Sequence, residues 1–357
     1  MEYNKVIQIC NYAANYAGNF LASLDSLAQR LKVMGKEVVF VFPNAAQNKK
    51  WEIDLSGFKM VYTDFDNDVE LFIKRIKKEI PNNGEVIIHT HFMNSMFLLK
   101  LKTILSSEDK VVFHEHMAVN YGIRQKIKGE IVKLFGFRNT VFIGVSPDVY
   151  NDLQKEVGKV RARLVVNSLD LDRLKVNNSN KKSKNILIFG SDYKRKGVDL
   201  AINAIEKAHL ESKVNLVVVT HSPKEAKKLI INEFNIIPSF VKIRRPSNDV
   251  RELYAECFLF LSPSRLEAFG YSVIEAKYTG MRVIASNVPG QNTLKNVPGI
   301  SWVDSENIDQ LSNAILKEYN SAEDNEMSIV KKSRRVIENK YSLERWVNQV
   351  INIYNEK

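Results

Sequence analysis

Short apolar runs alternate with amphipathic stretches through the first half of the chain. The runs have the length and composition of buried strands, and they occupy residues 5–10, 37–42, 58–62, 85–90, 110–116 and 141–146. After the first run, apolar residues recur at helical spacing, as at Leu24, Leu27 and Leu31, and Gly35 ends the pattern. Residues 68–80 repeat this helical spacing. Strand and helix in turn predict βαβ units and a parallel sheet.

The second half restarts the same alternation after a polar, linker-like run, "NNSNKKSKN", at residues 177–185. Apolar strands are predicted at residues 185–190, 214–220, 240–245, 258–264 and 281–287. Helices are predicted between them, at residues 197–208, 225–234, 249–257 and 271–280. We therefore predict two doubly wound α/β domains, residues 1–170 and 171–338, and a last amphipathic helix within 339–357. Two such sheets in tandem lead us to expect a ligand in a cleft between their strand ends.

The composition is that of a soluble globular protein, with 45% hydrophobic and 26% charged residues. No apolar run is long enough to span a bilayer, and the first residues lack the apolar core of a signal peptide. Cys10 and Cys257 both lie in apolar runs, which is typical of buried thiols in a reducing compartment. We therefore expect a cytoplasmic protein.

The net charge of +11 favours anionic partners, which include phosphorylated substrates, membrane phospholipid and nucleic acid. Nucleic acid is the weakest of the three, because the chain has no zinc-finger spacing, no RNP-like aromatic motif and no basic region followed by heptads. Residues 121–138 carry basic side chains around an apolar stripe that includes Ile123, Ile127 and Ile131. Such a segment lies either on an anionic bilayer or on its own domain with a solvated basic face.

The first candidate site is "SPSRLEAFGYSVIEAKYTG", residues 262–280, which joins a strand to a helix. Glu267 falls in the connecting loop and Glu275 within the helix, and Gly280 is the expected C-cap. The amide groups at the start of that helix can form an anion site, and they belong to Gly270, Tyr271 and Ser272. A phosphate could rest there, with Glu275 accepting hydrogen bonds from a hydroxylated neighbour such as ribose. The alternative is that Glu267 is a capping or surface residue and that Glu275 is a solvated residue of the helix.

The second candidate site is "FGSDYKRKGVDLAI", in which Gly190 ends a strand and Arg195, Lys196 and Gly197 precede a helix. Two cations at a helix start oppose the helix dipole unless an anion lies between them. We therefore interpret Arg195 and Lys196 as a grip on a diphosphate, with an ordinary basic loop as the alternative.

Two further patterns suggest a metal. His114 and His116 in "VVFHEH" would share one face of a strand, but a third ligand is not evident in the sequence, so we predict no metal there. His89 and His91 in "HTHF" end another strand and are less informative. The second pattern is an acidic run that ends at Asp68 and comprises Asp64, Asp66 and Asp68. It resembles the Asp-x-Asp that holds a metal in GT-A glycosyltransferases, and it also suits the N-cap of the following helix, which we prefer.

The stretch "SRLEAFGYSVIEA" resembles the E-x7-E motif of retaining glycosyltransferases with the GT-B fold, in particular glycosyltransferase family 4. The resemblance covers nearly the whole chain, weakly in the first half and strongly in the second. It implies two Rossmann-like domains that face each other across a cleft, the first for the acceptor and the second for the nucleotide sugar. It implies that Glu275 binds the donor ribose and that Glu267 faces the donor sugar near the reacting centre. The donor loop it implies comprises Phe269, Gly270, Tyr271 and Ser272.

The same resemblance extends to other positions. Lys196 matches the family's phosphate-binding lysine after the strand that ends at Gly190, but Ser191 stands where many members have arginine. We therefore assign the second phosphate contact to Arg195. His114 matches a histidine that approaches the donor sugar, and Thr293 stands where relatives usually carry glutamate.

The loop after the first strand resembles the family's small-residue loop, through Gly18 and Asn19, which in relatives touches the donor phosphate or sugar. Only one glycine is present against the usual pair, and a plain turn is an equal alternative. "YSLERW" resembles the start of the C-terminal helix that crosses back to the first domain, here within residues 339–357.

The function implied is transfer of a sugar, with retention, from a nucleotide diphosphate sugar, a UDP-sugar being favoured, to a glycan or lipid-linked acceptor in polysaccharide biosynthesis. Lys196, Arg195 and the helix start would stabilise the leaving diphosphate, so we predict neither metal nor other cofactor. Because many relatives act on lipid-linked acceptors, we favour peripheral contact of residues 121–138 with the inner face of the plasma membrane. The alternatives are a GT-B phosphorylase and a non-catalytic glycosyltransferase-like subunit.

Overall fold

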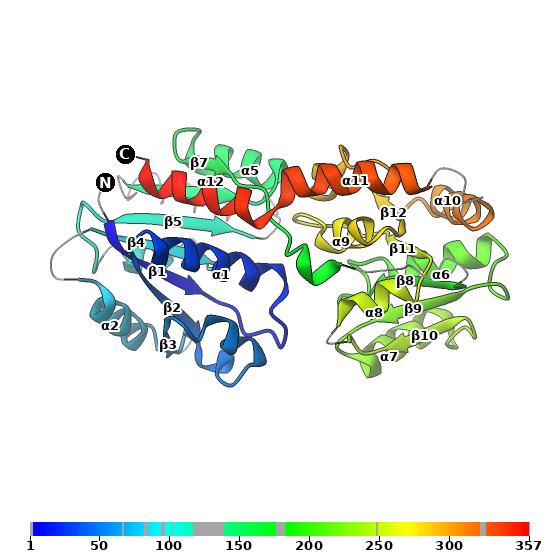
Figure 1. The fold of residues 1–357 in the computed structure, drawn as a ribbon. Coiled ribbons are helices and arrows are strands. Elements are labelled where there is room, and N and C mark those ends of the chain that lie inside the picture. The colour runs from blue at the N-terminus through cyan, green and yellow to red at the C-terminus, as the bar shows by residue number, and fades with distance from the viewer. Residues whose placement is uncertain are drawn as a thin grey trace. The chain divides into compact units, whose positions relative to one another are not determined.

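A computed structural model describes residues 3–65, 68–81, 85–93, 97–101, 103–116, 139–175, 183–247, 249–321 and 326–356. The chain divides into two compact units. Unit 1 comprises Met1–Asp170 and Tyr341–Lys357, and unit 2 comprises Leu171–Lys340. Each unit is built around its own parallel sheet and is described by itself (Figure 1).

Unit 1 contains a seven-stranded sheet in the order β3-β2-β1-β4-β5-β6-β7, with every pair of neighbours parallel. Its strands are β1 (Tyr3–Cys10), β2 (Glu37–Pro43), β3 (Lys59–Thr63), β4 (Glu85–His91), β5 (Lys110–Glu115), β6 (Thr140–Gly144) and β7 (Ala162–Leu164). Its helices are α1 (Gly18–Val33), α2 (Val69–Glu79), α3 (Phe97–Leu101), α5 (Pro147–Val157) and α12 (Leu343–Asn355). Short 3-10 turns follow β2, at Asn44–Ala46 and Lys50–Leu55.

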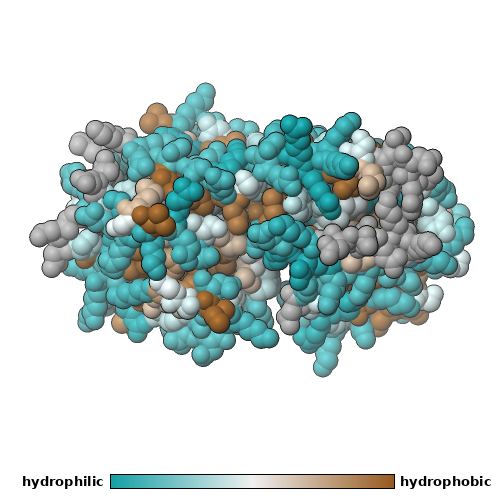
Figure 2. Space-filling view, viewed as in Figure 1, coloured by the Kyte–Doolittle hydropathy of each residue, from teal (hydrophilic) through white to brown (hydrophobic). Residues whose placement is uncertain are grey.

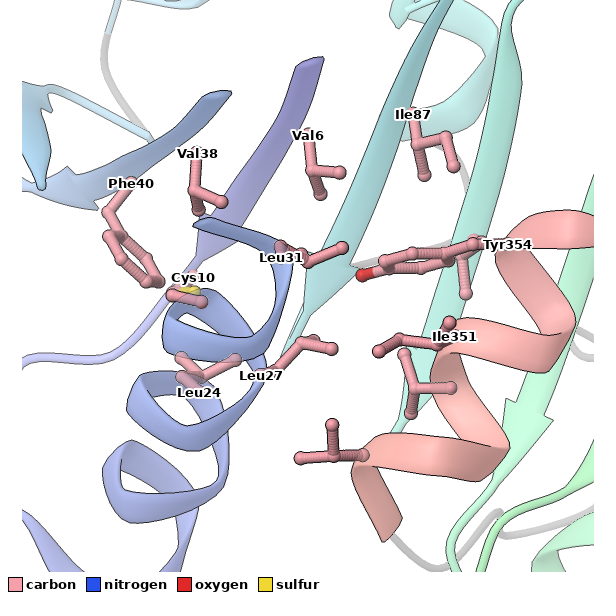
Figure 3. Packing of buried hydrophobic residues seen from close by; sticks show 14 of the residues in the cluster. Val6, Cys10, Leu24, Leu27, Leu31, Val38, Phe40, Ile87, Ile351 and Tyr354 are labelled. Carbon is pink, nitrogen blue, oxygen red and sulfur yellow. The ribbon is translucent and has the colours of Figure 1, made fainter. Parts of the chain in front are cut away.

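Helices α1 and α12 bury their apolar stripes on one face of the unit 1 sheet (Figure 3). Leu24, Leu27 and Leu31 of α1, spaced as the sequence predicts, pack there with Ile351 and Tyr354 of α12. The other face carries a second apolar cluster, to which α2 contributes. The central strands are thus buried on both faces, which is why apolar residues occupy successive positions in them, as in residues 86–88 and 111–113.

The C-terminal helix α12 belongs to unit 1 although it follows the whole of unit 2 in sequence. Its entry is fixed by the Leu169 amide, which donates to the Tyr341 carbonyl oxygen at 2.7 Å. Ser342 caps the helix by accepting a hydrogen bond from the Arg345 amide. At its far end the Lys110 ammonium donates to the backbone carbonyl of Glu356 at 2.8 Å. The predicted last helix is therefore present, and it packs on the sheet of unit 1.

Unit 2 contains a six-stranded parallel sheet in the order β10-β9-β8-β11-β12-β13. Its strands are β8 (Asn185–Phe189), β9 (Asn215–Val219), β10 (Val241–Arg244), β11 (Leu259–Ser262), β12 (Arg282–Ser286) and β13 (Ile300–Val303). Its helices are α6 (Val198–Lys207), α7 (Pro223–Phe234), α8 (Val250–Ala255), α9 (Tyr271–Thr279), α10 (Ile308–Asn320) and α11 (Glu326–Tyr341), the last of which ends at the boundary with unit 1. Short 3-10 turns lie at Asp172–Leu174 and Gln291–Leu294.

Several local predictions are confirmed. Asp68 caps α2, because its carboxylate accepts the Leu71 amide at 2.8 Å, and Gly280 ends α9 in the left-handed conformation. Cys10 and Cys257 are both buried free thiols. The sequence pattern missed β7 and β13, which are only three and four residues long and therefore too short to show a clear period.

Two expectations fall on parts of the chain that lie outside the described residues, namely the basic segment 121–138 and Asp66 of the acidic run. On the face shown in Figure 2, apolar side chains form scattered spots among polar ones. Across the described ranges, no helix is both long enough and apolar enough to cross a bilayer.

Candidate functional site

The predicted donor residues of unit 2 converge where the strand order of its sheet reverses. Strands β9 and β10 extend the sheet to one side of β8, whereas β11, β12 and β13 extend it to the other. The loops that follow β8 and β11 therefore leave the carboxyl edge of the sheet on either side of this switch point. Ligands of open α/β sheets bind at such a point. These two loops carry Gly190–Gly197 and Pro263–Gly270.

Lys196 and Glu267 meet across this point. The Lys196 ammonium contacts Glu267 Oε1, although 71 residues separate the two. Ser264 Oγ donates to the same oxygen at 3.0 Å, and Arg195 Nη1 lies 3.6 Å from it. Both side chains of the ion pair are mostly buried, with 16% of Lys196 and 11% of Glu267 exposed. The structure thus brings three of the predicted residues, Arg195, Lys196 and Glu267, into one cluster.

Gly197 allows the two loops to approach each other. It caps α6 in the left-handed conformation, with φ of +69°, and a Cβ there would overlap the carbonyl oxygen of Pro263. The Arg265 amide donates to the Arg195 carbonyl oxygen at 2.8 Å, which joins the loops a second time. The position of Lys196 opposite Glu267 is therefore fixed by backbone packing beside it.

An ion pair beneath the loops reinforces this arrangement. The Arg265 guanidinium donates to both carboxylate oxygens of Asp199, at 3.0 and 2.9 Å. Burial alone would raise the pKa of Asp199, but hydrogen bonds from Arg265 and Lys194 outweigh burial and the pKa is lowered. Asp199 is therefore ionised at neutral pH and anchors the loop after β11 to α6.

The start of α9 lies at the end of the Glu267 loop. Gly270 caps the helix with φ of +95° and offers no side chain to the first-turn amides. Gly290, from another loop, packs directly on this one, because a Cβ at Gly290 would overlap the Glu267 carbonyl oxygen. Phe269 is buried, and its ring lies 5.0 Å from that of Tyr271, edge to face. Ser272 follows in the first turn of the helix. Together these features make a rigid helix start that suits an anion.

Glu275, in the second turn of α9, has partners of its own. Arg173 Nη2 lies 2.5 Å from Oε1, and the Tyr254 hydroxyl donates to Oε2 at 2.8 Å. Burial raises the pKa of Tyr254 well above its usual value, so this hydroxyl remains a donor. Arg173 lies in the 3-10 turn just after the boundary between the units. A ribose bound to Glu275 would share or replace these partners.

Sequence reasoning missed Arg173, Tyr254 and Ser264. Ser264 carries a readable signal, because it precedes Glu267 by three residues within the same loop. Arg173 and Tyr254 carry none, since they reach Glu275 from 102 and 21 residues away. Gly190 is required for packing, because a Cβ there would lie 2.8 Å from Val218 and 2.9 Å from Val198.

The remaining predicted residues lie in unit 1. Gly18 begins α1 with φ of +60°, and Asn19 Oδ1 accepts the Asp170 amide at 3.1 Å. Asn19 is buried, and this hydrogen bond to Asp170 is a structural contact within unit 1. His114 lies at the end of β5 and is fully buried beside other histidines. The donor contacts expected of Gly18, Asn19 and His114 remain predictions.

Comparison with known proteins places this geometry in context. Residues 172–349 match the family model described as Glycosyl transferases group 1. An uncharacterized 41.2 kDa protein in the cps region of Klebsiella pneumoniae is 26% identical over 60% of this chain and 63% of its own length. The lipopolysaccharide glucosyltransferase WaaG of Escherichia coli K12 is 34% identical over 35% of this chain. The chain spans about a third of WaaG, 34% of its length, so these matches cover only parts of the curated relatives.

Likeness of structure extends further than likeness of sequence. The crystal structure of Anabaena Alr3699/HepE in complex with UDP superposes with a TM-score of 0.78, covering 98% of this chain and 99% of the other, at 14% identity. At that identity the likeness shows the fold alone. The predicted fold, two Rossmann-like α/β domains, is therefore confirmed. Residues 172–349, just under half of the chain, thus match the family Glycosyl transferases group 1, and the fold is that of the GT-B glycosyltransferases.

Proposed function

We propose that this chain is a retaining glycosyltransferase that moves a sugar from a nucleotide diphosphate sugar to a glycan or lipid-linked acceptor. The observation that carries the proposal is the cluster of Lys196 and Arg195 on Glu267 at the switch point of the unit 2 sheet. The family match covers this sheet. A UDP-sugar is favoured, since a neighbour of the same fold is described in complex with UDP.

The cluster suits a diphosphate because its cations already face an anion. In the described structure that anion is the Glu267 carboxylate, with Lys196 and Arg195 on it. A donor diphosphate at the start of α9 would draw the two cations toward its own oxygens. Glu267 would then accept hydrogen bonds from the sugar hydroxyls. As the bond to the diphosphate breaks, the cations and the helix start would stabilise the charge that develops on the leaving oxygen.

Retention would follow from attack on the same face that the diphosphate leaves. The bond between the anomeric carbon and the diphosphate oxygen breaks, and the acceptor oxygen bonds to that carbon. The acceptor hydroxyl gives its proton to the departing phosphate oxygen. In this scheme Glu267 positions the sugar and does not form a covalent intermediate. Lys196 and Arg195 supply the positive charge, and this supports the proposal that the reaction needs no metal ion.

The acceptor is proposed by analogy. One relative is described as a lipopolysaccharide glucosyltransferase, which supports a glycan or lipid-linked acceptor and a role in polysaccharide biosynthesis. The net charge of +11 suits such an anionic acceptor or the membrane that carries it. Membrane contact through residues 121–138 stays a prediction, because this segment lies outside the described residues.

A second candidate is a non-catalytic subunit that kept the fold. It is favoured by one observation, the engagement of both Glu275 oxygens by Arg173 and Tyr254. If that engagement persists, fewer lone pairs of the Glu275 carboxylate are left to accept hydrogen bonds from a ribose. The two candidates therefore differ in whether a nucleotide binds with the help of this carboxylate.

Calorimetry with UDP and with GDP, each with and without Mg²⁺, tests the donor site. We expect one of the nucleotides to bind without metal and Glu275→Ala to lose most of that affinity. Glu206→Ala, an exposed carboxylate on α6 of the same unit, is the matched control and should bind as the unchanged protein does. If neither UDP nor GDP binds, the donor-site assignment is wrong and the non-catalytic candidate is favoured.

A further inference from the structure

Four of the six histidines gather in one cluster inside unit 1. His89 and His91 alternate along β4, and His114 lies directly beside His91 on β5. His116 follows two residues later, so all four rings face the same side of the sheet. His89, His91 and His114 are completely shielded from solvent. The sequence named both pairs but gave no third ligand for either, and the register of β4 and β5 is what brings the two pairs together.

Polar side chains around the cluster orient the rings. The Gln8 amide nitrogen donates to the Tyr354 hydroxyl at 3.0 Å, so the amide oxygen faces His91 Nε2, also at 3.0 Å. An amide oxygen only accepts, so His91 Nε2 carries the proton and Nδ1 carries the lone pair. His89 Nδ1 lies 2.7 Å from the Tyr354 hydroxyl, which directs its Nε2 toward His114. Outer partners of this kind fix the rings of metal-binding histidines.

The inner nitrogens lie close to one another. His89 Nε2 is 3.2 Å from His114 Nδ1, and His91 Nδ1 is 3.0 Å from His116 Nε2. His114 Nε2 is fully buried and has no hydrogen-bond partner among the described residues. A buried imidazole nitrogen without a partner is costly to keep. The cluster thus holds more ring nitrogens than its own hydrogen bonds satisfy.

The charge state of the rings suits ligation. Burial lowers the pKa of His116 to about 3 and holds those of His89, His91 and His114 well below the usual value. Burial thus disfavours the charged imidazolium, and a metal binds the neutral ring.

We propose that His89, His91 and His114 form a binding site for a divalent transition metal of the zinc class. Each of the three offers a ring nitrogen, and these nitrogens all lie within 4.8 Å of one another. Zinc–nitrogen bonds of about 2.0–2.1 Å separate two ligands of a tetrahedral ion by about 3.4 Å. His89 Nε2 and His114 Nδ1 already have nearly this separation, at 3.2 Å, so His114 would bind the ion through Nδ1 and not through its unpartnered Nε2. Small rotations of the rings would bring the third nitrogen into place.

The metal would act as a clip inside unit 1. His89 and His91 come from β4 and His114 from β5, and the outer partners Gln8 and Tyr354 come from β1 and α12. The bound ion would therefore tie the central strands to the C-terminal helix. The site lies in unit 1, whereas Lys196, Glu267 and Glu275 lie in unit 2. Because His114 is also the residue expected to approach the donor sugar, the test reads metal content and not transfer. Imidazole ligands suit Zn²⁺, with Cu²⁺ and Ni²⁺ as competitors that bind in other geometries.

The test starts with metal content. The full chain without an affinity tag, treated with a chelator and then loaded with Zn²⁺, should retain about one zinc per chain after desalting. Loading with Co²⁺ should give visible absorption bands of a nitrogen-ligated ion. X-ray absorption at the zinc edge should show imidazole nitrogens at about 2.0–2.1 Å. A melting temperature that rises with Zn²⁺ and falls again with chelator should accompany the binding.

Variants separate this site from adventitious binding. His89→Gln and His114→Gln should each lose the zinc and the cobalt bands. The matched control is the double variant His209→Asn and His221→Gln, which removes the two histidines outside the cluster and should bind metal unchanged. If a cluster variant fails to fold, the cobalt spectrum of the unchanged protein still tests the proposal, because that spectrum does not depend on the variant. Absence of zinc retention and of cobalt bands in that protein, or loss of them in the control only, would overturn the proposal.

Discussion

The Lys196 ammonium contacts the Glu267 carboxylate across the point where the strand order of the unit 2 sheet reverses. The two residues come from the loops after β8 and β11, which left-handed Gly197 allows to touch. A mostly buried pair of opposite charges at a ligand-binding edge can exchange partners when a charged ligand arrives. A donor diphosphate would replace Glu267 as the partner of Lys196, and Glu267 would turn to the sugar.

Lys196→Met should weaken UDP binding because the cation for the diphosphate is lost. A hydrogen bond to a charged group contributes about 1.5–3 kcal/mol, which corresponds to roughly 10- to 150-fold in affinity. Uridine, which has no phosphate, should bind both proteins equally in the same calorimetric experiment. Equal loss for uridine would show that the variant damages the site generally.

Glu267→Gln should separate binding from transfer. The variant keeps the size of the side chain and removes the negative charge near the phosphates, so UDP should bind at least as tightly as before. Transfer should fall by about 10²–10³, as for the loss of one well-placed group at a reacting centre. The measurement is release of UDP from a UDP-sugar in the presence of acceptor. Unchanged turnover would remove Glu267 from the reacting centre.

Gly197→Ala should destabilise unit 2 strongly. The new Cβ must adopt a left-handed conformation, at about 1–2 kcal/mol, and it also meets the Pro263 carbonyl oxygen, for about 1–3 kcal/mol more. Gly35→Ala is the matched control, since Gly35 also has positive φ but has nothing within 4 Å of the new Cβ. In urea unfolding, the control should lose only the about 1–2 kcal/mol that the left-handed conformation costs. Equal losses would mean that the loops relax around Gly197.

Asp199→Asn should destabilise unit 2 in a pH-dependent way. The folded-state pKa of Asp199 lies below the unfolded value, so its ion pair with Arg265 stabilises the fold above the unfolded pKa of about 3.9. That contribution is lost as pH falls through the folded-state pKa. At pH 7 the variant should lose about 2–4 kcal/mol of unfolding free energy, because an arginine is left without its buried partner.

Urea unfolding of both proteins between pH 7 and pH 3 measures the Asp199 effect. The difference in unfolding free energy should shrink toward pH 3. The exposed Asp309→Asn on α10 is the control and should change stability by less than about 0.5 kcal/mol. A difference that stays constant with pH would show that the Asp199 charge is not what stabilises the loops.

The sequence by itself determined the local structure of this protein. Periodic segments such as α1, and cap residues such as Asp68 and Gly280, were correct because periodicity and capping depend on residues within one or two turns. The loop from Glu267 to Gly270 was recognised in the same way, since its pattern is contiguous.

Only the tertiary structure decided which distant residues meet. Lys196 touches Glu267, Arg173 reaches Glu275, and His89 joins His114, at separations of 71, 102 and 25 residues. These pairings depend on strand order, on register and on which loops a glycine allows to approach. None of the three is encoded in the spacing of nearby residues, because a contact between elements is set by how the sheet is assembled and not by the period of either element.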